Sequence, residues 1–496
     1  MKLFVDSRMV SQGVYEVLRA FFREEFDIEK IEALNRDQGF FAAIWHDDES
    51  DELCVEIDRK ERACLRLVVT DPDFESREYK LKQRQLMYQA ARKLTGRELP
   101  WGILTGIRPT KIIAQERAKG RGDKEIAERL QSVFFVSQEK TDLVFLVDEI
   151  EKPILDAVQL DSYSLYVGIP FCPTRCSYCS FPSYARNKHE DWVAPYLEKL
   201  HEEVKETARL YQGWKLSSVY IGGGTPTALK ADELRALIRV IRKAFSVQES
   251  VEFTVEAGRP DTLNEEMFDM LKAEGVTRIS INPQTMKDET LVRIGRSHKS
   301  EEVVEVFRLA REKGFEEINM DLIVGLPGET PLDFKQTLKS IGELSPDQVT
   351  VHSLAVKRAS SLGERDYRHK EEQVWEGIDQ LLYGFAEEAG YVPYYLYRQK
   401  NIVGNMENVG FTRPNRVNLY NTLIMSDRQT IAACGVGAVS KFVYPDHIER
   451  VGNPKSIPTY LEGLHRRMEK KANCLTKFQE YDINTEKYIV GNEEDE

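Results

Sequence analysis

From Tyr163 onward, short apolar runs typical of β-strands alternate with longer amphipathic stretches typical of helices. Such alternation predicts an α/β fold in which parallel strands are joined by helical crossovers. The predicted strands are Leu165–Ile169, Val219–Ile221, Val251–Glu256, Arg278–Ile281, Ile318–Val324 and Gln348–Val351. The predicted helices are Val193–Tyr211, Asp232–Phe245, Met267–Glu274, Ser300–Lys313 and Pro331–Ile341. Six such units predict an open partial (βα)6 barrel of the TIM type, with its chemistry at the carboxyl ends of the strands.

A chain of 496 residues is too long for a single core, so several domains are expected. Residues 1–160 indicate an N-terminal α+β domain, residues 161–360 the partial barrel, and residues 361–496 a smaller C-terminal domain covering its mouth. The stretch Pro100–Lys111 is expected to form a turn before a helix that begins at Pro109. Outside the barrel, strands are predicted at Met1–Val5, Phe40–Trp45, Leu53–Asp58 and Cys64–Thr70, and helices at Tyr79–Leu94, Thr141–Leu160 and Lys370–Ala389.

The composition narrows the class of protein. Hydrophobic residues make up 41% of the chain and charged residues 30%, which is typical of a soluble globular protein. No apolar run is long enough to cross a bilayer, and the first residues reach charge before a secretory core forms. The formal net charge of −13 argues against a general nucleic-acid-binding surface. We therefore expect a cytoplasmic protein that neither binds nucleic acid nor spans a membrane.

Three of the seven cysteines, Cys172, Cys176 and Cys179, fall in one short turn after the first barrel strand. Sites for zinc or for a closed iron–sulfur cluster usually take four protein ligands, so this turn is one ligand short. Three thiolates can hold three irons of a 4Fe–4S cluster and leave the fourth iron free to bind S-adenosylmethionine. Zinc would need His189, which lies outside the usual paired spacing. Ordinary buried thiols are expected at the scattered positions Cys54, Cys64, Cys434 and Cys474.

Aromatic residues and glycines near the strand ends are candidates for binding this cofactor. Tyr166 either contacts a sulfonium by cation–π attraction or simply packs, and Tyr178 can lie beside the adenine. Phe181 is expected to shield the cluster. The run Gly222–Thr227 follows the second strand, and its glycines let a ligand approach the backbone closely. A phosphate loop would need a Lys-Ser/Thr pair at the right spacing, which does not follow this run.

Charged and amide side chains complete the candidate set. Glu256 and Asp321 lie in otherwise apolar strands, so each carboxylate needs a partner. That partner is either a structural cation or the hydroxyls and ammonium of the cofactor. Gln284, at the end of the fourth strand, can bond the ribose or the carboxylate. Arg296 offers a planar fork for the cofactor carboxylate, or is a surface arginine.

These motifs together resemble one known family. The run Tyr-x-x-Ile-Pro-Phe-Cys-x3-Cys-x2-Cys, the run Gly-Gly-Gly-Thr-Pro-Thr and the segment Asp321–Gly328 are similar in order and spacing to the oxygen-independent coproporphyrinogen III oxidases, which are radical-SAM enzymes. The N-terminal region and the Trp101–Thr110 stretch resemble the HemZ-type branch. The resemblance implies a radical-SAM barrel that holds a 4Fe–4S cluster and one or two S-adenosylmethionine molecules. It assigns cofactor contacts to Tyr166, Tyr178, Gly223, Gly224, Thr225, Glu256, Gln284, Arg296 and Asp321, with looser matches at Ala355 and Val439.

The resemblance also implies a reaction and its partners. An external low-potential electron donor reduces the cluster, and the cleaved cofactor takes a hydrogen atom from a propionate of coproporphyrinogen III. Carbon dioxide then leaves and a vinyl group forms, and two such events give protoporphyrinogen IX in haem biosynthesis. Tyr166 and Arg398 are the residues assigned to catalysis, with Arg398 as a contact for the carboxylates of the tetrapyrrole. Solvated surface charges are the simpler interpretation of Lys400, Arg413 and Arg416.

Two departures from the family pattern leave other functions open. The decarboxylases often carry histidine two residues after the signature tyrosine, where this chain has Gly168. They also often carry a fourth cysteine where this chain has Phe181. One alternative is a haem-binding chaperone of the same superfamily, which keeps the cluster without performing this reaction. Another is a radical-SAM enzyme that acts on a different tetrapyrrole.

Overall fold

The chain separates into two compact units in the computed structural model. The first unit comprises Met1–Phe145 and Arg398–Asn405, and the second comprises Leu146–Tyr397 and Met406–Glu496. The predicted division at residues 160 and 360 stays a prediction. The structure describes residues 1–9, 12–22, 24, 26–34, 40–59, 61–106, 108–355, 375, 377–399, 402 and 406–478.

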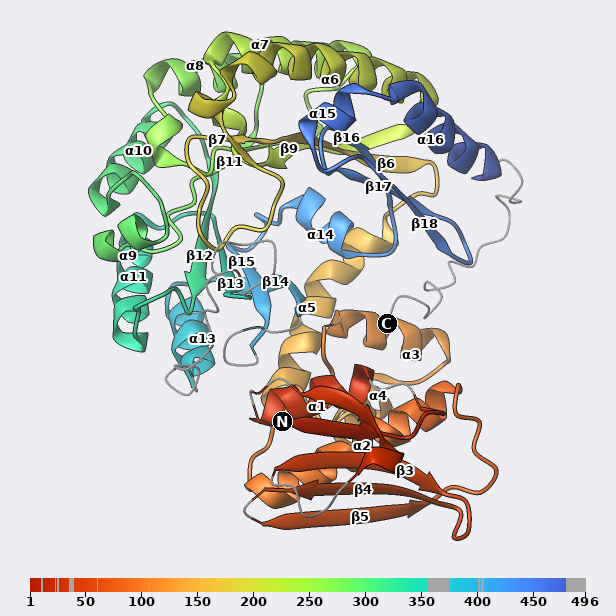
Figure 1. Cartoon of the computed structure of the whole chain (residues 1–496). Coiled ribbons are helices and arrows are strands. Elements are labelled where there is room, and N and C mark those ends of the chain that lie inside the picture. Colours follow the sequence, from red (N-terminus) through yellow and green to blue (C-terminus); the bar gives the residue numbers. More distant parts are fainter. Residues whose placement is uncertain are drawn as a thin grey trace. The chain divides into compact units, whose positions relative to one another are not determined.

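The second unit is built on an eleven-stranded sheet with the order β14-β15-β13-β12-β11-β10-β9-β6-β16-β17-β18 (Figure 1). Its six central strands, from β13 to β6 in this order, lie parallel to one another, and the order has two free ends, so the sheet does not close. The predicted α/β partial barrel with six parallel strands is therefore confirmed. The six strands are β6 (Ser162–Ile169), β9 (Lys215–Gly223), β10 (Glu252–Glu256), β11 (Arg278–Ser280), β12 (Glu317–Val324) and β13 (Gln348–Ser353).

Amphipathic helices connect these strands and lie along the outer side of the sheet (Figure 1). In α7 (Ala231–Ala244), Leu234, Leu237 and Ile241 recur at helical spacing and are fully buried. The other helices of the region are α6 (Glu190–Leu210), α8 (Glu265–Ala273), α9 (Asp288–Arg293), α10 (Ser300–Glu312) and α11 (Pro331–Leu344). No helix among the described residues is both long enough and apolar enough to span a membrane.

Residues beyond the sixth barrel strand extend the same sheet at both of its ends. Next to β13 lie β15 (Asn408–Thr412) and β14 (Val392–Tyr397), both in antiparallel pairings. On the other side, β16 (Thr430–Cys434) pairs in parallel with β6, followed by the antiparallel strands β17 (Val439–Val443) and β18 (Ile448–Gly452). The helices here are α13 (Ile378–Glu388), α14 (Leu419–Met425), α15 (Ile457–Leu461) and α16 (Leu464–Phe478).

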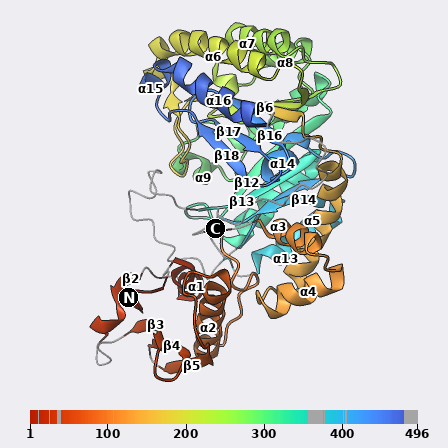
Figure 2. The ribbon, with the colours of Figure 1, turned by 90° about the vertical axis from the view of Figure 1, so that its right-hand side faces the viewer.

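The short helix α14 lies inside the curve of the sheet, where it packs against β9 and β14 (Figures 1 and 2). Its N-cap is Asn418, and Glu252 of β10 accepts hydrogen bonds from the first two backbone N–H groups of the helix. In the predicted helix Lys370–Ala389, residues 370–374 and 376 lie outside the described residues, and α13 accounts for most of the remainder.

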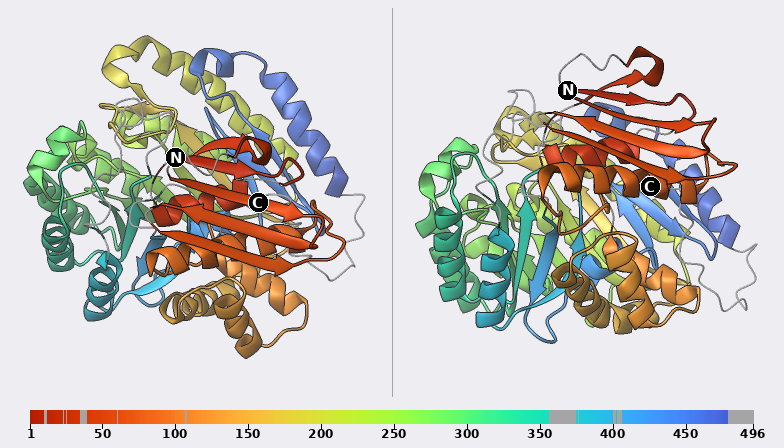
Figure 3. Two further views of the ribbon diagram at one scale, coloured as in Figure 1. Left: turned by 60° about the horizontal axis from the view of Figure 1, so that its bottom comes forward. Right: turned by 90° about the horizontal axis from the view of Figure 1, so that it is seen from below.

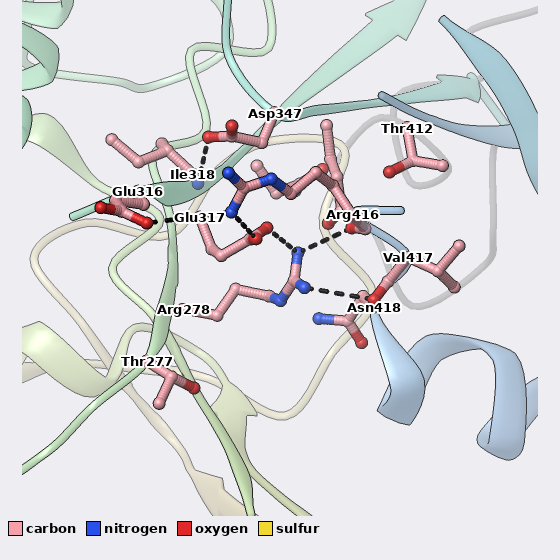
Figure 4. A network of polar contacts seen from close by, with 12 residues as sticks. Thr277, Arg278, Glu316, Glu317, Ile318, Asp347, Thr412, Arg416, Val417 and Asn418 are labelled. Carbon is pink, nitrogen blue, oxygen red and sulfur yellow. Dashed lines mark hydrogen bonds and ion pairs between the residues drawn. The ribbon is translucent and has the colours of Figure 1, made fainter. Parts of the chain in front are cut away.

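A buried arginine ties the amino ends of three barrel strands together. Figure 4 shows its contacts with Glu317, Arg416 and Val417. Arg278 of β11 forms ion pairs with Glu317 at 3.0 Å and with Glu252 at 3.4 Å, and donates to the carbonyls of Arg416 and Val417 at 3.2 Å. Several acceptors offset the cost of burying this charge. Arg416 also pairs with Glu317, so it lies at the end of the barrel opposite the carboxyl edge.

The first unit contains a five-stranded sheet with the order β2-β1-β3-β4-β5, and the helices α1 and α2 lie on one face of it (Figure 3). The core between them includes Leu18, Ile44 and Met87. The predicted strands Leu53–Asp58 and Cys64–Thr70 correspond to β4 and β5, which pair antiparallel. The elements are β1 (Lys2–Val5), α1 (Gln12–Phe22), β2 (Asp27–Lys30), β3 (Phe41–Asp47), β4 (Glu52–Asp58), β5 (Arg62–Val68), α2 (Arg77–Thr95), α3 (Pro109–Ala118), α4 (Asp123–Ser132) and the beginning of α5 (Gln138–Asp156).

Local sequence explains two further features of this unit. The helix predicted to begin at Pro109 is confirmed by α3, whose first residue is that proline. Gly102 in the preceding turn has φ +53°, and a Cβ there would lie 1.9 Å from the carbonyl oxygen of Phe134. The expectation that all four scattered cysteines are buried was wrong for Cys64, because side chains alternate along β5 and Cys64 points away from the core that its neighbour Ala63 faces.

Candidate functional site

The cysteine turn follows β6 at the carboxyl edge of the barrel sheet, where the fold predicts the chemistry. The thiol of Cys172 is buried, and those of Cys176 and Cys179 are half-buried. Burial raises the pKa of Cys172 to about 11 and also raises that of Cys179. These two thiols therefore keep their protons near neutral pH until a positively charged ligand binds to the sulfur atoms and displaces the protons.

The turn is anchored by the residues that follow helix α9 and by the loop after β9. The backbone N–H of Ser177 donates to the carbonyl of Ile294 at 3.0 Å, and the hydroxyl of Thr174 donates to that of Gly295 at 2.7 Å. On the other side, the hydroxyl of Thr225 lies 3.5 Å from the sulfur of Cys172. The three cysteines are thus held between loops that are distant in the sequence.

The glycine run Gly222–Gly224, at the end of β9, packs directly against the cysteine turn. A Cβ on Gly224 would lie 2.7 Å from the carbonyl oxygen of Phe171 and 3.0 Å from the sulfur of Cys172. Gly223 has φ +109°, a region that L-residues rarely adopt. A Cβ on Gly222 would lie 2.8 Å from a carboxylate oxygen of Glu256. The run is therefore required for close packing of β6, β9 and β10, in addition to any role toward a ligand.

Glu256, the last residue of β10, lies beside this run. Its carboxylate accepts hydrogen bonds from the hydroxyl of Tyr220 at 2.5 Å and from the N–H of Gly223 at 3.0 Å. Burial, together with the neighbouring charge of Asp321, raises the pKa of Glu256 to about 7. A carboxyl group with this pKa changes its charge near neutral pH and becomes a better acceptor for a cationic ligand as the pH rises.

Three tyrosine rings line the interior of the barrel next to Glu256. Tyr220 stacks on Tyr420 of α14 with centroids 4.4 Å apart, and the ring of Tyr166 lies 6.2 Å from each of them. Burial raises the pKa of all three hydroxyls, so they remain neutral. Tyr166 therefore has packing partners, as well as a ring at the site edge that a cation could contact.

Gln284, in the loop after β11, lies next to Asp321 of β12. The N–H of Gln284 donates to the carbonyl of Asp321 at 2.9 Å, and Gln284 has φ +69° although it is not a glycine. Strained backbone of this kind clusters at functional sites. Asp321 accepts a hydrogen bond from the amide of Asn319 at 2.7 Å and lies 4.0 Å from a ring nitrogen of His352.

Arg296 is buried behind the cysteine turn rather than exposed on the surface. Its guanidinium donates to the carbonyls of Asn282 and Gly258 and lies 3.4 Å from the hydroxyl of Tyr178. Its Nε is buried and has no hydrogen-bond partner in the described part of the chain. Two residues further on, His298 is buried with neither ring nitrogen bonded to a described residue, and burial lowers its pKa to about 4.

Three further residues were predicted to contact the cofactor or the substrate. Ala355 is the second residue after β13 and precedes the residues 356–374, which lie outside the described part. Val439 begins β17 and is 45% exposed. Arg398 belongs to the first unit, where it is buried with its guanidinium over the ring of Trp101 and donates to the carbonyl of Leu104. Lys400, named as a surface charge, lies outside the described residues.

The donor set at the cysteine turn fits an iron–sulfur cluster better than a single metal ion. No three His, Cys, Asp or Glu side chains in the described ranges are arranged around a point that could hold one ion. His189 instead packs on Trp192, with ring centroids 4.6 Å apart. Each thiolate of a cubane cluster binds its own iron, so three separated thiols in one turn suit a cluster.

Sequence reasoning missed several residues that contribute to this edge. Arg259, in the loop after β10, is buried and lies 3.9 Å from the sulfur of Cys176. The hydroxyl of Tyr196 donates to the carbonyl of Gly168. Tyr220 and Tyr420 complete the aromatic stack. Arg259 could have been predicted from the sequence. It comes three residues after Glu256, the last residue of β10, so it must lie at the same carboxyl edge of the sheet as Glu256.

Comparisons with known proteins agree with this geometry. Residues 166–341 match the family model described as the Radical SAM superfamily. The oxygen-independent coproporphyrinogen-III oxidase-like protein HemZ of Bacillus subtilis is 40% identical over 78% of this chain and 79% of its own length. The heme chaperone HemW of Haemophilus influenzae is 28% identical over 66% of this chain and 82% of its own. The structure of coproporphyrinogen III oxidase (HemN) from Escherichia coli, a radical SAM enzyme, superposes with a TM-score of 0.53 at 26% identity, covering 66% of this chain and 73% of that one.

Proposed function

Because the chain belongs to the radical SAM superfamily, among the oxygen-independent coproporphyrinogen III oxidase-like proteins, we propose that it oxidatively decarboxylates two propionates of coproporphyrinogen III to give protoporphyrinogen IX. Proteins of this superfamily use a 4Fe–4S cluster and S-adenosylmethionine. One observation carries the proposal to this chain: three thiols, a glycine run and a buried carboxylate of raised pKa converge at one edge of the barrel.

Cys172, Cys176 and Cys179 would hold the cluster, since three thiolates leave one iron open for the amino and carboxylate groups of S-adenosylmethionine. When bound, the cluster and S-adenosylmethionine together would supply a species that abstracts a hydrogen atom. Glu256 and the backbone around Gly223 would accept hydrogen bonds from the ammonium group. The buried Nε of Arg296, which has no partner in the described chain, would donate to the carboxylate.

The remaining contacts orient the cofactor and the substrate. Tyr178 and Tyr166 would flank the adenine and the sulfonium, and Gln284 and Asp321 would bond the ribose. Gly224 and Thr225 would set the distance between the cofactor and the cysteine turn. Ala355 and Val439 would contact a second S-adenosylmethionine. Arg398 stays a proposed contact for a carboxylate of the tetrapyrrole, although in this structure its guanidinium is engaged by Trp101 and Leu104.

The overall step balances without an additional oxidant. Each propionate loses one hydrogen atom, one electron and carbon dioxide, and becomes a vinyl group. When bound, S-adenosylmethionine would supply the acceptor for this hydrogen atom and this electron, with methionine and 5′-deoxyadenosine as the products. An external low-potential donor is needed to supply the first electron, and the electron released by the substrate is available to replace it.

Anaerobic reconstitution of the full chain tests this function. With dithionite, S-adenosylmethionine and coproporphyrinogen III, we expect 5′-deoxyadenosine and protoporphyrinogen IX to form at about two to one. The Cys176→Ala variant should form neither product, and full activity in that variant would contradict the cluster assignment. If 5′-deoxyadenosine forms without protoporphyrinogen, coproporphyrinogen III is the wrong substrate.

A haem-binding chaperone is the second candidate, because Gly168 stands where the decarboxylases often carry histidine. A Cβ on Gly168 would already lie 3.3 Å from the carbonyl oxygen of Val436, so the backbone here is packed around glycine. HemW chaperones are among the relatives of this chain. Titration of the reconstituted protein with haem distinguishes the two functions: stoichiometric, stable binding without decarboxylation supports the chaperone.

A further inference from the structure

Arg259 occupies a buried position at the cysteine turn that the family resemblance does not assign. It follows β10 and is 2% exposed. Its Nε and Nη2 donate to the two carboxylate oxygens of Asp261 at 3.0 and 2.9 Å, in a bidentate pair. Its Nη1 faces the turn, where it lies 3.9 Å from the sulfur of Cys176. One guanidinium thus joins a carboxylate to a cluster cysteine.

The same guanidinium also holds the backbone of the turn. Nη1 donates to the carbonyl of Thr174 at 3.3 Å, and both Nη atoms lie 3.1 Å from its hydroxyl oxygen. That hydroxyl donates in turn to Gly295, next to Arg296. The carbonyl of Arg259 accepts hydrogen bonds from the N–H and hydroxyl of Thr262. The side chain of Arg259 is therefore fixed from both ends, so its charge occupies a defined place.

A fixed positive charge beside the cluster cysteines changes the reduction potential of a cluster bound there. A 4Fe–4S cluster on three thiolates becomes more negative by one charge when it is reduced. Nearby positive charge and hydrogen bonds to the sulfur atoms stabilise the more negative state and raise the reduction potential. The position is buried, so water screens the interaction only weakly. Asp261, whose side chain is 19% exposed, acts in the opposite direction through its negative charge.

We propose that the Arg259–Asp261 pair sets the reduction potential of the cluster, with Arg259 raising it through its charge and its contact with Cys176, and Asp261 limiting that rise. Arg259 is thus a positioning residue that acts through the cluster. The inference rests on the proposed cluster site at Cys172, Cys176 and Cys179. It does not depend on the identity of the substrate.

The test is a redox titration of the reconstituted full-length protein, monitored by electron paramagnetic resonance without substrate. Arg259→Gln should shift the midpoint potential to a more negative value, because it removes the charge and the N–H contact with sulfur. Asp261→Asn should shift it to a more positive value, because Arg259 is then uncompensated. Arg259→Lys keeps the charge and should fall between Arg259→Gln and the wild type. Opposite shifts cannot arise from a merely structural role, which would disturb both variants alike.

Arg278→Gln is the matched control, since it removes another buried arginine paired with carboxylates at the amino ends of the strands (Figure 4). It should lower the stability of the protein and leave the midpoint potential unchanged. If Arg259→Gln takes up no cluster, the midpoint potential of Asp261→Asn alone tests the proposal. An unchanged or more negative potential in Asp261→Asn overturns it. A wild-type protein that takes up no cluster overturns the proposed site together with this inference.

Discussion

Glu256 shows how the fold changes the chemistry of one side chain. As an isolated carboxyl group it would be ionised at neutral pH, with a pKa of 4.5. In the barrel, burial and the proximity of Asp321 raise that pKa to about 7, although Tyr220 and the N–H of Gly223 donate hydrogen bonds to the ionised form. The site therefore contains an acceptor whose charge depends on conditions and on any cation that binds beside it.

This raised pKa has a measurable effect on stability. Between pH 4.5 and about 7 the folded protein binds the Glu256 proton more tightly than the unfolded chain, so the free energy of unfolding falls as the pH rises. The Glu256→Gln variant loses this titration. From about pH 5 to about pH 8, the wild type should lose up to about 3 kcal/mol relative to the variant, at about 1.4 kcal/mol per pKa unit. Urea unfolding at both pH values measures the difference.

The exposed Glu249 provides the control for this experiment. Glu249→Gln should follow the same pH dependence of unfolding as the wild type. If Glu256→Gln also follows the wild type, the carboxyl group is not held in its protonated form by the fold, and the electrostatic description of the site is wrong.

The elements of the barrel meet the cysteine turn through backbone contacts, and this makes the glycine run a structural requirement. The N–H of Gly224 donates to the carbonyl of Ile169, and the N–H of Thr225 donates to that of Phe171, both at 2.7 Å. The loop after β9 is thereby bound to the loop after β6. A side chain at Gly224 would enter the space in which these two backbones touch.

Gly224→Ala should therefore separate the two loops. Its Cβ would meet the carbonyl oxygen of Phe171 at 2.7 Å and that of Ile169 at 2.9 Å, and backbone atoms cannot turn aside as the end of a long side chain can. We expect a loss of about 1–3 kcal/mol in stability and a lower iron content after reconstitution. Thermal unfolding and iron analysis of the purified variant measure the two effects.

A glycine-to-alanine substitution elsewhere in the chain should raise the stability of the protein instead of lowering it. Gly384 lies within α13, and nothing lies within 4 Å of a Cβ placed there. Gly384→Ala should stabilise the protein by about 0.5–1 kcal/mol, because alanine favours the helix and loses less backbone entropy on folding. If both variants change the stability by the same amount, the contact at Gly224 has no special cost.

At the scale of the second unit, one buried ion pair connects the end of the chain to the first barrel helix. Lys471 of α16 lies 2.8 Å from Glu203 of α6, and both side chains are almost fully buried. Burial opposes ionisation of Glu203, but Lys471 and hydrogen bonds from Tyr460 and the N–H of Gly435 hold its pKa below the usual value. The network joins α6, α15, α16 and the loop after β16.

Removal of one member of this pair should leave an uncompensated buried charge. Lys471→Met is expected to destabilise the unit by about 3–5 kcal/mol, which thermal unfolding should detect as a large fall in Tm. The double variant Lys471→Met with Glu203→Leu removes both charges and should recover part of that loss. A double variant as unstable as the single one would show that the hydrogen bonds to Gly435 and Tyr460, rather than the pairing of charges, dominate.

Much of the barrel could be predicted from the sequence, because its signals are local. Apolar runs followed by amphipathic helices indicated the six parallel strands, and the three cysteines in one turn indicated an incomplete ligand set. Pro109 marked the beginning of α3. In the first unit, α1 and β2 were missed, and Asp27–Lys30 carries three charged residues in four, which is unusual for a strand.

Only the tertiary structure decided which distant residues meet. Arg259 is 83 residues from Cys176 in the chain, and Tyr420 is 200 residues from Tyr220, so no local pattern could pair them. The strands beyond residue 390 join both ends of the barrel sheet, because the edges left open by six strands present unpaired backbone groups. Local propensity determines the elements and the residue types at their ends, whereas burial and the pairing of charges, which set the pKa of Glu256 and the place of Arg259, depend on the folded whole.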